Sequence, residues 1–455
     1  MRIGVSQKGP IQEEAKMVSS LGRSGRQTGI VALAVTLAVA FTGCASSPST
    51  PTAGSTIKIG ILTTCGGPFA TFEQESFSGA KFALVQNAGG KAQGAGPEDQ
   101  VSGATVAGHP IQISFGCSDA SPDVALKEAR RLIQDVGVDI LLGPLSGDEG
   151  IAISNYAKQV PNKTFVNGTS GAQDTTLKVK APNFFRFGGD GAQWMAGLGA
   201  YAYKTLNWRN VAILGEDYSY PWTQAAGFAA EFCPAGGHIT KRIWVPLGTT
   251  DWSSSVAQLP RNIDGFLLLT GGTDTVAVEK SYVGLGGNLA THMLGGSVVL
   301  DPTSFTVGDA LNGLTGATPV PQGSTDSAWT TYVQSLEAVY PANPKGSLAG
   351  SLFTALYYNG MNAIIQGLKA TNGDLSGNEA NFQKTLSGLS LSTPNGAITL
   401  DSNRNAIITN YNVQIVKQSD GSLGFKVLNT LPNVNETFNG FFGPTSSMTR
   451  DQPTC

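Results

Sequence analysis

Hydrophobic positions in the first third of the chain form short apolar runs that alternate with stretches of helical spacing. The run at 57–62 is rich in β-branched residues and is typical of a strand buried in a parallel sheet. Glycines and a proline break it at 63–68, and the spacing of apolar residues then predicts a helix over 76–87. The same alternation predicts strands at 109–115, 138–142 and 164–166, a helix over 121–136, and a further helix ending at Lys158. Strands that alternate with helices in this way indicate a doubly wound parallel α/β sheet.

The pattern restarts after a possible crossover at 183–189 and predicts a second α/β lobe of about the same size. Residues 302–327 are rich in Gly, Pro and Thr and are expected to form a loop. A strongly apolar helix is expected at 351–371, and the alternation over 395–427 is typical of an antiparallel ribbon. In the second lobe we expect helices at 193–205, 222–232 and 252–259, and strands at 210–214, 238–245 and 265–269.

The amino-terminal segment, 1–43, is interpreted as a secretory signal and not as part of the fold. Arg23 and Arg26 precede a short apolar run, which ends in Thr-Gly-Cys at Cys44. This ending resembles a bacterial lipobox, in which the cysteine becomes the lipidated first residue. Residues 44–56 are then a flexible tether to the membrane. An ordinary signal peptide, and translation from Met17, remain alternatives.

The chain has a low charge for its length of 455 residues. Only 13% of its residues are charged, and the formal net charge is −3. Without 1–43, the balance of 24 basic and 30 acidic residues is mildly acidic. A nucleic-acid partner would require a basic face, so this class of partner is excluded.

Four cysteines remain after Cys44 in a chain that we expect to be exported. Four cysteines allow three pairings, and an oxidising compartment favours disulfides. Cys65 and Cys117 both fall at the carboxyl ends of predicted strands, so we favour Cys65–Cys117 together with Cys233–Cys455. Free buried thiols are the alternative.

Several short sequences carry a family resemblance: 57–62, Gly67-Pro68, Gly79-Ala80, Ser118-Asp119, 142–144, 356–361 and 396–405. They resemble those of the type I periplasmic solute-binding proteins of branched-chain amino acid ABC importers. The resemblance covers roughly 57–430, and a lipobox suits the membrane-anchored form of such a receptor. It implies two doubly wound lobes joined by a three-segment hinge, with crossovers near 187–189, 301–302 and 392–395. The first lobe then comprises 57–187 and 302–394, and the second comprises 188–301 and the closing ribbon and tail, 395–455.

The resemblance also implies where a ligand binds. In the family, hydroxyls and backbone N–H groups after the third and fourth strands hold the carboxylate of the ligand, close to helix N-termini. Aromatic side chains form the walls, with Trp194, Tyr218 and Trp222 as further candidates near Tyr220. The matching positions in this chain are Ser146, Gly147, Gly168, Thr169, Ser170, Phe72 and Tyr220, and we add Thr273 and Ser297 in the second lobe.

The position of Ser297 departs from the pattern of the family. Amino acid binders usually have an acidic residue there, because an ammonium group buried without a carboxylate costs several kcal/mol. Either another acid replaces it, with Glu73, Asp217 and Asp274 as the leading candidates beside Asp148, or the ligand carries no ammonium group.

The sequence contains no motif of a familiar enzyme, and its three histidines show no catalytic or metal-ligand spacing. We therefore expect no catalysis, no cofactor and no metal. The leading hypothesis is a monomeric, lipid-anchored receptor on the outer face of the cell membrane, which presents a small polar organic solute to ABC permease subunits. A sensor that signals to a membrane partner is the alternative, and a secreted enzyme is a third hypothesis.

Overall fold

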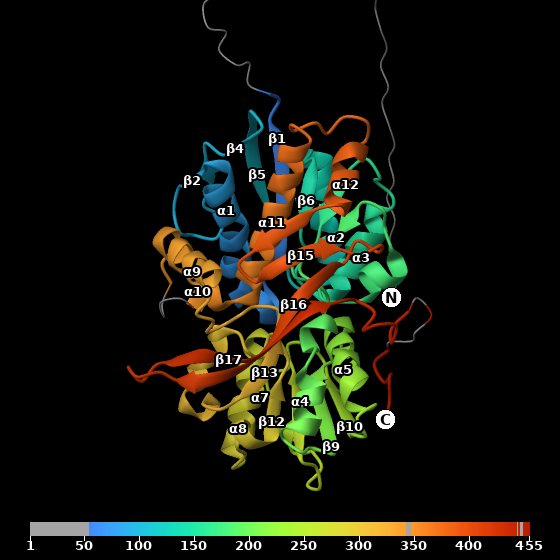
Figure 1. Ribbon diagram of the computed structural model, residues 1–455, viewed down its shortest axis with the longest axis vertical. Helices are drawn as coiled ribbons and strands as arrows, with labels where there is room; N and C mark the ends of the chain where they lie inside the picture. Colours follow the sequence, from blue (N-terminus) through green and yellow to red (C-terminus); the bar gives the residue numbers. More distant parts are fainter. Residues whose placement is uncertain (1–53, 343–346, 444, 446–448) are drawn as a thin grey trace, which may run out of the picture. The chain divides into compact units, whose positions relative to one another are not determined.

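The computed structural model describes residues 54–455 except 343–346, 444 and 446–448 (Figure 1). The expected signal segment, Cys44 and the first part of the tether lie outside the described residues. Two sheets with flanking helices form two lobes, which confirms the predicted fold class. The residues searched contain no helix that is long and apolar enough to cross a membrane.

The first lobe is built on a sheet with the strand order β4-β5-β1-β6-β7-β8. All its pairings are parallel except that of β4 with β5. The central strands are buried on both faces, as the continuous apolar runs predict. The strands are β1 (Ile57–Thr64), β4 (Thr105–Val106), β5 (His109–Ser118), β6 (Ile140–Leu142), β7 (Thr164–Val166) and β8 (Phe184–Phe185), and a separate ribbon pairs β2 (Lys91–Ala92) with β3 (Val101–Ser102).

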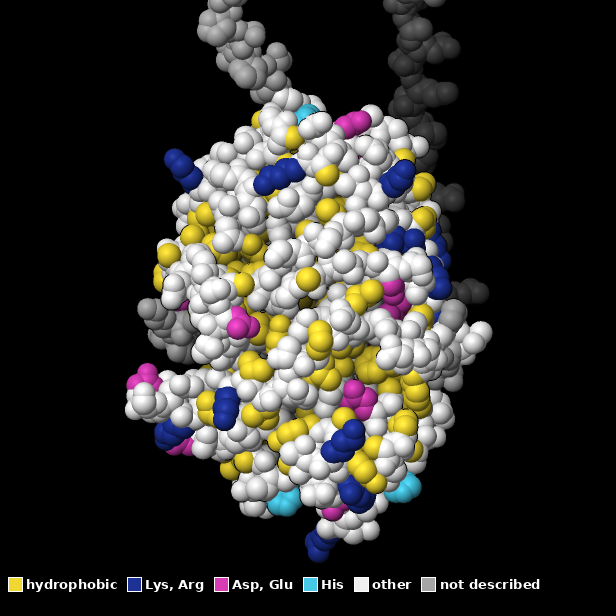
Figure 2. Space-filling model, in the orientation of Figure 1, with side chains coloured by type: hydrophobic (Ala, Val, Ile, Leu, Met, Phe, Trp, Pro, Cys, Tyr) yellow, Lys and Arg dark blue, Asp and Glu magenta, His cyan; other side chains and the backbone are white. Residues whose placement is uncertain are grey.

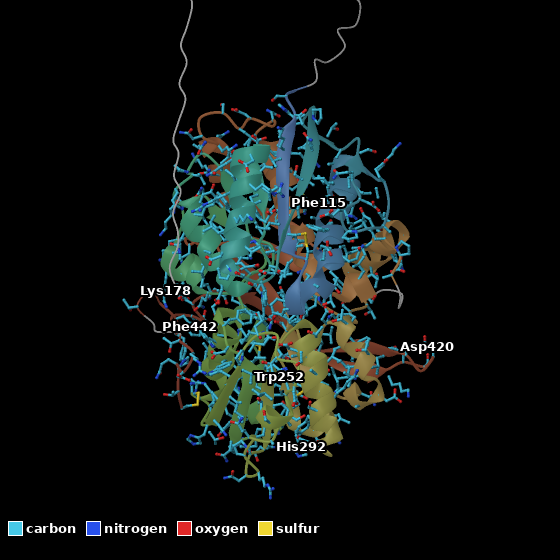
Figure 3. All side chains as sticks on the ribbon, turned by 180° about the vertical axis from the view of Figure 1, so that it is seen from behind. Phe115, Lys178, Trp252, His292, Asp420 and Phe442 are labelled. Atoms are coloured by element: carbon cyan, nitrogen blue, oxygen red, sulfur yellow. A yellow bond between two sulfur atoms is a disulfide. The ribbon has the colours of Figure 1, made fainter. Side chains whose placement is uncertain are left out.

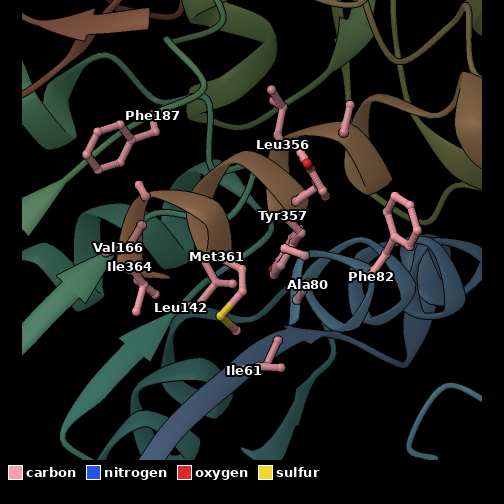
Figure 4. Packing of buried hydrophobic residues seen from close by; sticks show 14 of the residues in the cluster. Ile61, Ala80, Phe82, Leu142, Val166, Phe187, Leu356, Tyr357, Met361 and Ile364 are labelled. Atoms are coloured by element: carbon pink, nitrogen blue, oxygen red, sulfur yellow. The ribbon is translucent and has the colours of Figure 1, made fainter. Parts of the chain in front are cut away.

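Helix α11 (Leu352–Ala370) is the most deeply buried helix of this lobe. Figure 4 shows its residues Leu356, Met361 and Ile364 among side chains of the sheet and of α1. Gly79 of α1 permits this close packing, because a Cβ there would lie 2.1 Å from the Thr354 carbonyl oxygen. The other helices are α1 (Glu73–Ala88), α2 (Pro122–Arg130), α3 (Gly147–Ala157), α9 (Ser327–Val339), α10 (Ser347–Gly350) and α12 (Ala380–Ser387), with the short helical turns η1 (Gly67–Phe72), η2 (Arg131–Val136) and η3 (Thr175–Val179).

The second lobe contains a longer sheet with the order β10-β9-β11-β12-β13-β16-β15-β14, and β17 also pairs with β16. In the second lobe its strands are β9 (Asn210–Glu216), β10 (His238–Val245), β11 (Gly265–Leu269), β12 (Met293–Gly295), β13 (Thr315–Thr318), the later part of β16 (Ala406–Lys417) and β17 (Leu423–Val434). Its last strands, β14 (Ser390–Thr393) and β15 (Gly396–Leu400), extend the sheet into the first lobe, because Leu391 and Ile398 belong to the core of that lobe (Figure 1). Its helices are α4 (Leu198–Lys204), α5 (Ser219–Phe232), α6 (Ser253–Val256), α7 (Gly272–Gly284) and α8 (Leu289–His292), with the turns η4 (Gln193–Met195), η5 (Pro302–Val307) and η6 (Asp309–Leu311).

Strand β16 connects the two lobes. Its first residues, including Ala406 and Ile408, belong to the hydrophobic core of the first lobe. Further along the strand, Val413 and Ile415 belong to the core of the second. Figure 1 shows β16 running from β15 towards β17 and β13. One continuous strand therefore forms part of the hinge.

Two expectations from the sequence are wrong, one about residues 302–327 and the other about residues 193–205. The stretch 302–327 is not simply a loop, because it contains η5, η6 and β13, and β13 pairs with β12 and β16 in the second sheet. The second lobe therefore continues beyond 301, as far as Thr318 at least. The helix expected at 193–205 is broken into η4 and α4 at Gly197, whose φ of +85° does not fit a helix.

Both favoured disulfides are present, one joining Cys65 to Cys117 and the other joining Cys233 to Cys455 (Figure 3). The first links the paired ends of β1 and β5, since Cys117 lies opposite Thr63 in the parallel register. The second holds the carboxyl terminus against the end of α5. On the face drawn in Figure 2, charged side chains are scattered and form no large patch of one sign.

Candidate functional site

A cavity between the two lobes brings together residues from the carboxyl ends of both sheets. The first lobe contributes Ser146, Gly147 and Thr169, and the second contributes Tyr218, Tyr220 and Gly271. The space open to the centre of a water molecule is about 20 Å³, roughly the room that one water needs. The lobes are therefore closed on each other, and an organic ligand enters only if they separate or the lining moves. The remaining lining residues are apolar: Phe69, Phe72, Leu145, Trp194, Val298 and Phe353.

Half of the lining residues are aromatic, and several of their rings pack against one another. Phe72 stacks on Phe353, with 3.9 Å between ring centroids. Trp194 lies edge-on to Tyr220 at 5.8 Å, and its indole N–H donates to the carbonyl oxygen of Gly188 at 2.7 Å. Rings in offset or edge-on contact stabilise one another beyond their burial. The aromatic part of the wall is therefore apolar and rigid.

The amino end of α3 supplies the polar part of the lining. Ser146 is the N-cap of α3, and its backbone N–H donates to the Glu149 carboxylate at 2.9 Å. The N–H of Gly147, in the first turn, has no acceptor within the helix. This end of α3 therefore offers a free backbone donor and the positive end of the helix dipole to an anion.

Gly147 is also a point of close approach between the two lobes. A Cβ there would lie 2.6 Å from Ser219 Oγ and 3.0 Å from the backbone nitrogen of Tyr220, both in α5 of the second lobe. Asp148 strengthens the same contact, because its carboxylate accepts from the Ser219 N–H at 3.2 Å. The two lobes can therefore close in this way only because position 147 is a glycine.

Ser297 lies behind the cavity wall and not in its lining. Its hydroxyl oxygen is 2.9 Å from the Tyr220 hydroxyl oxygen and accepts from the Gln224 amide at 2.8 Å. The side chain at the family's acidic position thus orients Tyr220. Burial raises the pKa of Tyr220, so its hydroxyl remains protonated at neutral pH.

The hydroxyl of Tyr218 is also protonated at neutral pH, because its pKa is raised as well. Burial raises its pKa well above the ordinary value, and the Glu216 carboxylate raises it further. The protonated residue lines the cavity.

The other predicted site residues are placed as follows. Thr169 lines the cavity, whereas Gly168 packs against the Tyr357 ring and Ser170 donates to the Gly147 carbonyl oxygen at 3.4 Å. Thr273 lines a different cavity. The tryptophan at 222 donates to Asp217 and is not part of the lining.

None of the candidate ammonium partners lines the cavity. The carboxylate of Glu73 lies within 4.8 Å of the sulfurs of the Cys65–Cys117 disulfide. Asp217 pairs with Arg450 at 2.7 Å. Asp274 accepts from the Gly248 N–H at 2.9 Å, and burial raises its pKa to about 6. The lining residues therefore include no carboxylate to receive an ammonium group.

Sequence reasoning missed five lining residues: Phe69, Leu145, Gly271, Val298 and Phe353. Phe69 follows the Gly-Pro break after β1, and Gly271 is the first residue of the Gly-Gly break after β11, a signal that could have identified both. Phe353 gave no such signal, because it reaches the cavity from α11, far along the chain.

A buried polar network at the hinge was also missed. Arg186 is fully buried, and its guanidinium lies 3.9 Å from the Asp190 carboxylate and donates to Asn405 at 3.2 Å. Glu436 accepts from Asn403 at 2.9 Å in the same network. These residues tie the first crossover to β16 and to the segment after β17.

Comparisons with known proteins agree with this architecture. A family model described as "Periplasmic binding protein" matches residues 56–422. A relative from Brucella melitensis, "Leu/Ile/Val-binding protein homolog 6", is 23% identical over 392 residues, which cover 82% of this chain and 91% of the relative. The following structures share the fold. One is a solute-binding protein of an ABC transporter from Rhodopseudomonas palustris in complex with 3,4-dihydroxybenzoic acid, with a TM-score of 0.73 and 21% sequence identity. The match covers 84% of this chain and 98% of that protein's chain. Another is a leucine-binding protein from Thermotoga maritima, with a TM-score of 0.68 and 18% sequence identity. The match covers 83% of this chain and 99% of that protein's chain.

Proposed function

The chain belongs to the periplasmic binding protein family, and we propose that it is the receptor through which an ABC importer takes up a small carboxylate with an aromatic body. The resemblance drawn from the sequence is confirmed, and members of this family bind small molecules for ABC transporters. The relatives are substrate-binding proteins and not enzymes.

The residues that line the cavity are the main reason for choosing this class of ligand. The cavity combines aromatic walls and the amino end of α3 with a lining that contains no carboxylate. Such a lining suits an anionic group at α3 and a ring packed against the aromatic wall that includes Phe72, Phe353 and Trp194. It disfavours leucine, whose ammonium group would be buried without a partner. The similar protein from R. palustris holds 3,4-dihydroxybenzoic acid, which has this chemistry.

A thermal-stability screen tests the ligand class. The panel comprises benzoate, 4-hydroxybenzoate, 3,4-dihydroxybenzoate, leucine, benzamide and short aliphatic carboxylates. A ligand present at 100 times its dissociation constant stabilises the folded state by about 2.7 kcal/mol. We expect a shift with the aromatic acids, a smaller one with benzamide, and none with leucine. A shift with leucine alone would overturn the aromatic assignment.

The proposal places the receptor on the outer face of the cell membrane, held as a monomer by a lipid on Cys44, where it meets the permease subunits. The lipobox-like ending at Cys44 supports this placement. We expect Cys44→Ser to move the protein from the membrane fraction to the soluble fraction. If both forms fractionate with the membrane, the anchor lies elsewhere.

A further inference from the structure

One face of helix α5, in the second lobe, meets the first lobe. The residues on this face follow one another at intervals of four, three and four: Ser219, Thr223, Ala226 and Ala230. At the end nearest the ligand cavity, Ser219 contacts α3 of the first lobe. One turn further on, the backbone N–H of Gln173 in the first lobe donates to Thr223 Oγ1 at 3.4 Å.

Beyond these contacts the face carries only the two alanines, and an aromatic side chain from the carboxyl-terminal part of the chain packs there. Phe442, which is 3% exposed, belongs to a small hydrophobic cluster. The other members are Leu177 of η3, Ala192 just before η4, and Ala226 of α5. Phe438 packs against this cluster, with its ring edge-on to that of Phe442 at 5.5 Å between centroids. Figure 3 shows Phe442 at the height where the two lobes meet.

The chain is fixed to a different lobe on each side of Phe442. Before it, the side-chain amide of Gln173 in the first lobe donates to the backbone carbonyl oxygen of Glu436 at 2.7 Å. After it, Cys455 is bonded to Cys233, at the end of α5 in the second lobe. The ring is therefore held at the junction and does not belong to one lobe alone.

A ring buried between two bodies that can separate favours the arrangement in which it is buried. Phe442 is the largest side chain of a cluster that includes Leu177 from the first lobe and Ala226 from the second. When the lobes separate, apolar surface of this cluster passes into water, which is unfavourable. Phe442 is not among the residues that line the ligand cavity, so it acts on a ligand only through closure.

We propose that Phe442 is a positioning residue, which holds the lobes in the closed arrangement by packing between them. The contact lies further along α5 than the ligand cavity, so the two ends of this helix face are fixed to the first lobe independently. The proposal concerns closure and does not depend on the ligand proposed above.

The distance between two spin labels, one on each lobe, tests the proposal in the protein without ligand. Lys127 of α2 and Lys280 of α7 are exposed and lie on different lobes, so Lys127→Cys/Lys280→Cys provides the labelling sites. Double electron–electron resonance then gives the populations of the short and the long distance. We expect the short distance in the labelled parent protein, and a loss of its population by about fivefold or more in Phe442→Ala.

Phe441→Ala is the matched control for this measurement. Phe441 is the neighbouring ring but is 43% exposed and lies outside the cluster, so this change should leave the distance distribution as it is in the parent protein. Phe442→Leu keeps an apolar side chain in the cluster and should recover most of the short distance. It also serves as the test variant if Phe442→Ala does not fold, with a smaller loss in the same direction.

A residue that only stabilises the fold would lower the unfolding free energy without changing the ratio of the two distances. An unchanged distribution in folded Phe442→Ala and Phe442→Leu would therefore overturn the proposal, as would a parent protein that shows the long distance alone. Titration with 4-hydroxybenzoate adds a readout that rests on the proposed function. Its affinity should fall by about the same factor as the closed population. If no aromatic acid binds, the proposed function fails, whereas the distances still decide the role of Phe442.

Discussion

The hydroxyl oxygens of Tyr220 and Ser297 lie 2.9 Å apart, one in the lining of the cavity and the other behind it. Ser297 also accepts from Gln224, so the three side chains form a buried chain of hydrogen bonds. Under the proposed function, Ser297 would act on the ligand through Tyr220, and the consequence can be measured.

Replacing Ser297 by alanine should destabilise the protein and weaken ligand binding. The change leaves the Gln224 amide and the Tyr220 hydroxyl without their shared partner, at a cost of about 1–3 kcal/mol. Chemical denaturation gives the free energy of unfolding, and titration with 4-hydroxybenzoate gives the affinity. Ser254→Ala, at an exposed position of α6, is the control and should change neither quantity. An unchanged affinity in Ser297→Ala would mean that Tyr220 does not need this support.

Gly147→Ala should weaken ligand binding by holding the lobes apart. The new methyl group would lie 2.6 Å from Ser219 Oγ and 3.0 Å from the Tyr220 backbone nitrogen, so α5 must withdraw from α3. We expect at least a tenfold loss of affinity and a larger radius of gyration by small-angle X-ray scattering with ligand present. Gly284→Ala at the end of α7, where a Cβ meets no atom within 4 Å, should be neutral or stabilising by up to about 1 kcal/mol. Wild-type affinity in Gly147→Ala would show that closure tolerates this methyl group.

Glu379 should make the stability of the protein depend on pH. Burial raises its pKa from 4.5 to about 7, although Thr164 donates to its carboxylate at 2.6 Å. Because the folded pKa is above the unfolded one, the folded state binds the proton more tightly. The stabilisation is complete below pH 4.5 and is lost as the pH rises through 7.

The measurement compares the wild type with Glu379→Gln, which keeps the acceptor for Thr164. Relative to this variant, the wild type should lose about 2–3 kcal/mol of unfolding free energy between pH 4.5 and 7.5. Comparison with the variant cancels the contributions of other buried acids. Asp135→Asn, at an exposed position, should follow the wild-type pH profile. Parallel profiles for the wild type and Glu379→Gln would contradict the prediction.

Removing the Cys65–Cys117 disulfide by a double change to serine should lower the unfolding free energy by about 2–4 kcal/mol. The bond closes a loop of 52 residues and so limits the freedom of the unfolded chain. Denaturation of the double variant, compared with Cys233→Ser/Cys455→Ser, measures both bonds. An unfolding free energy equal to that of the wild type would show that the paired ends of β1 and β5 hold without the disulfide.

The local sequence determined the secondary structure and the fold class of this protein. The runs at 57–62 and 138–142 are apolar throughout because both faces of their strands are buried, and Ser121-Pro122 at the start of α2 follows the ordinary chemistry of helix ends. The same local signals placed Ser146, Gly147 and Thr169 at the ends of strands, where parallel sheets bind ligands. The preferred cysteine pairing followed from strand ends as well.

Tertiary structure alone decided which of these residues face the ligand cavity. Phe353 stacks on Phe72 across a long sequence separation, Ser297 lies behind Tyr220, and the candidate acids Asp217 and Asp274 point to Arg450 and Gly248. Nothing in the local sequence fixes such contacts, since they depend on how the two lobes close. Hydrophobic periodicity reports which face of an element is buried, whereas the residue that it is buried against is set by the packing of the whole chain.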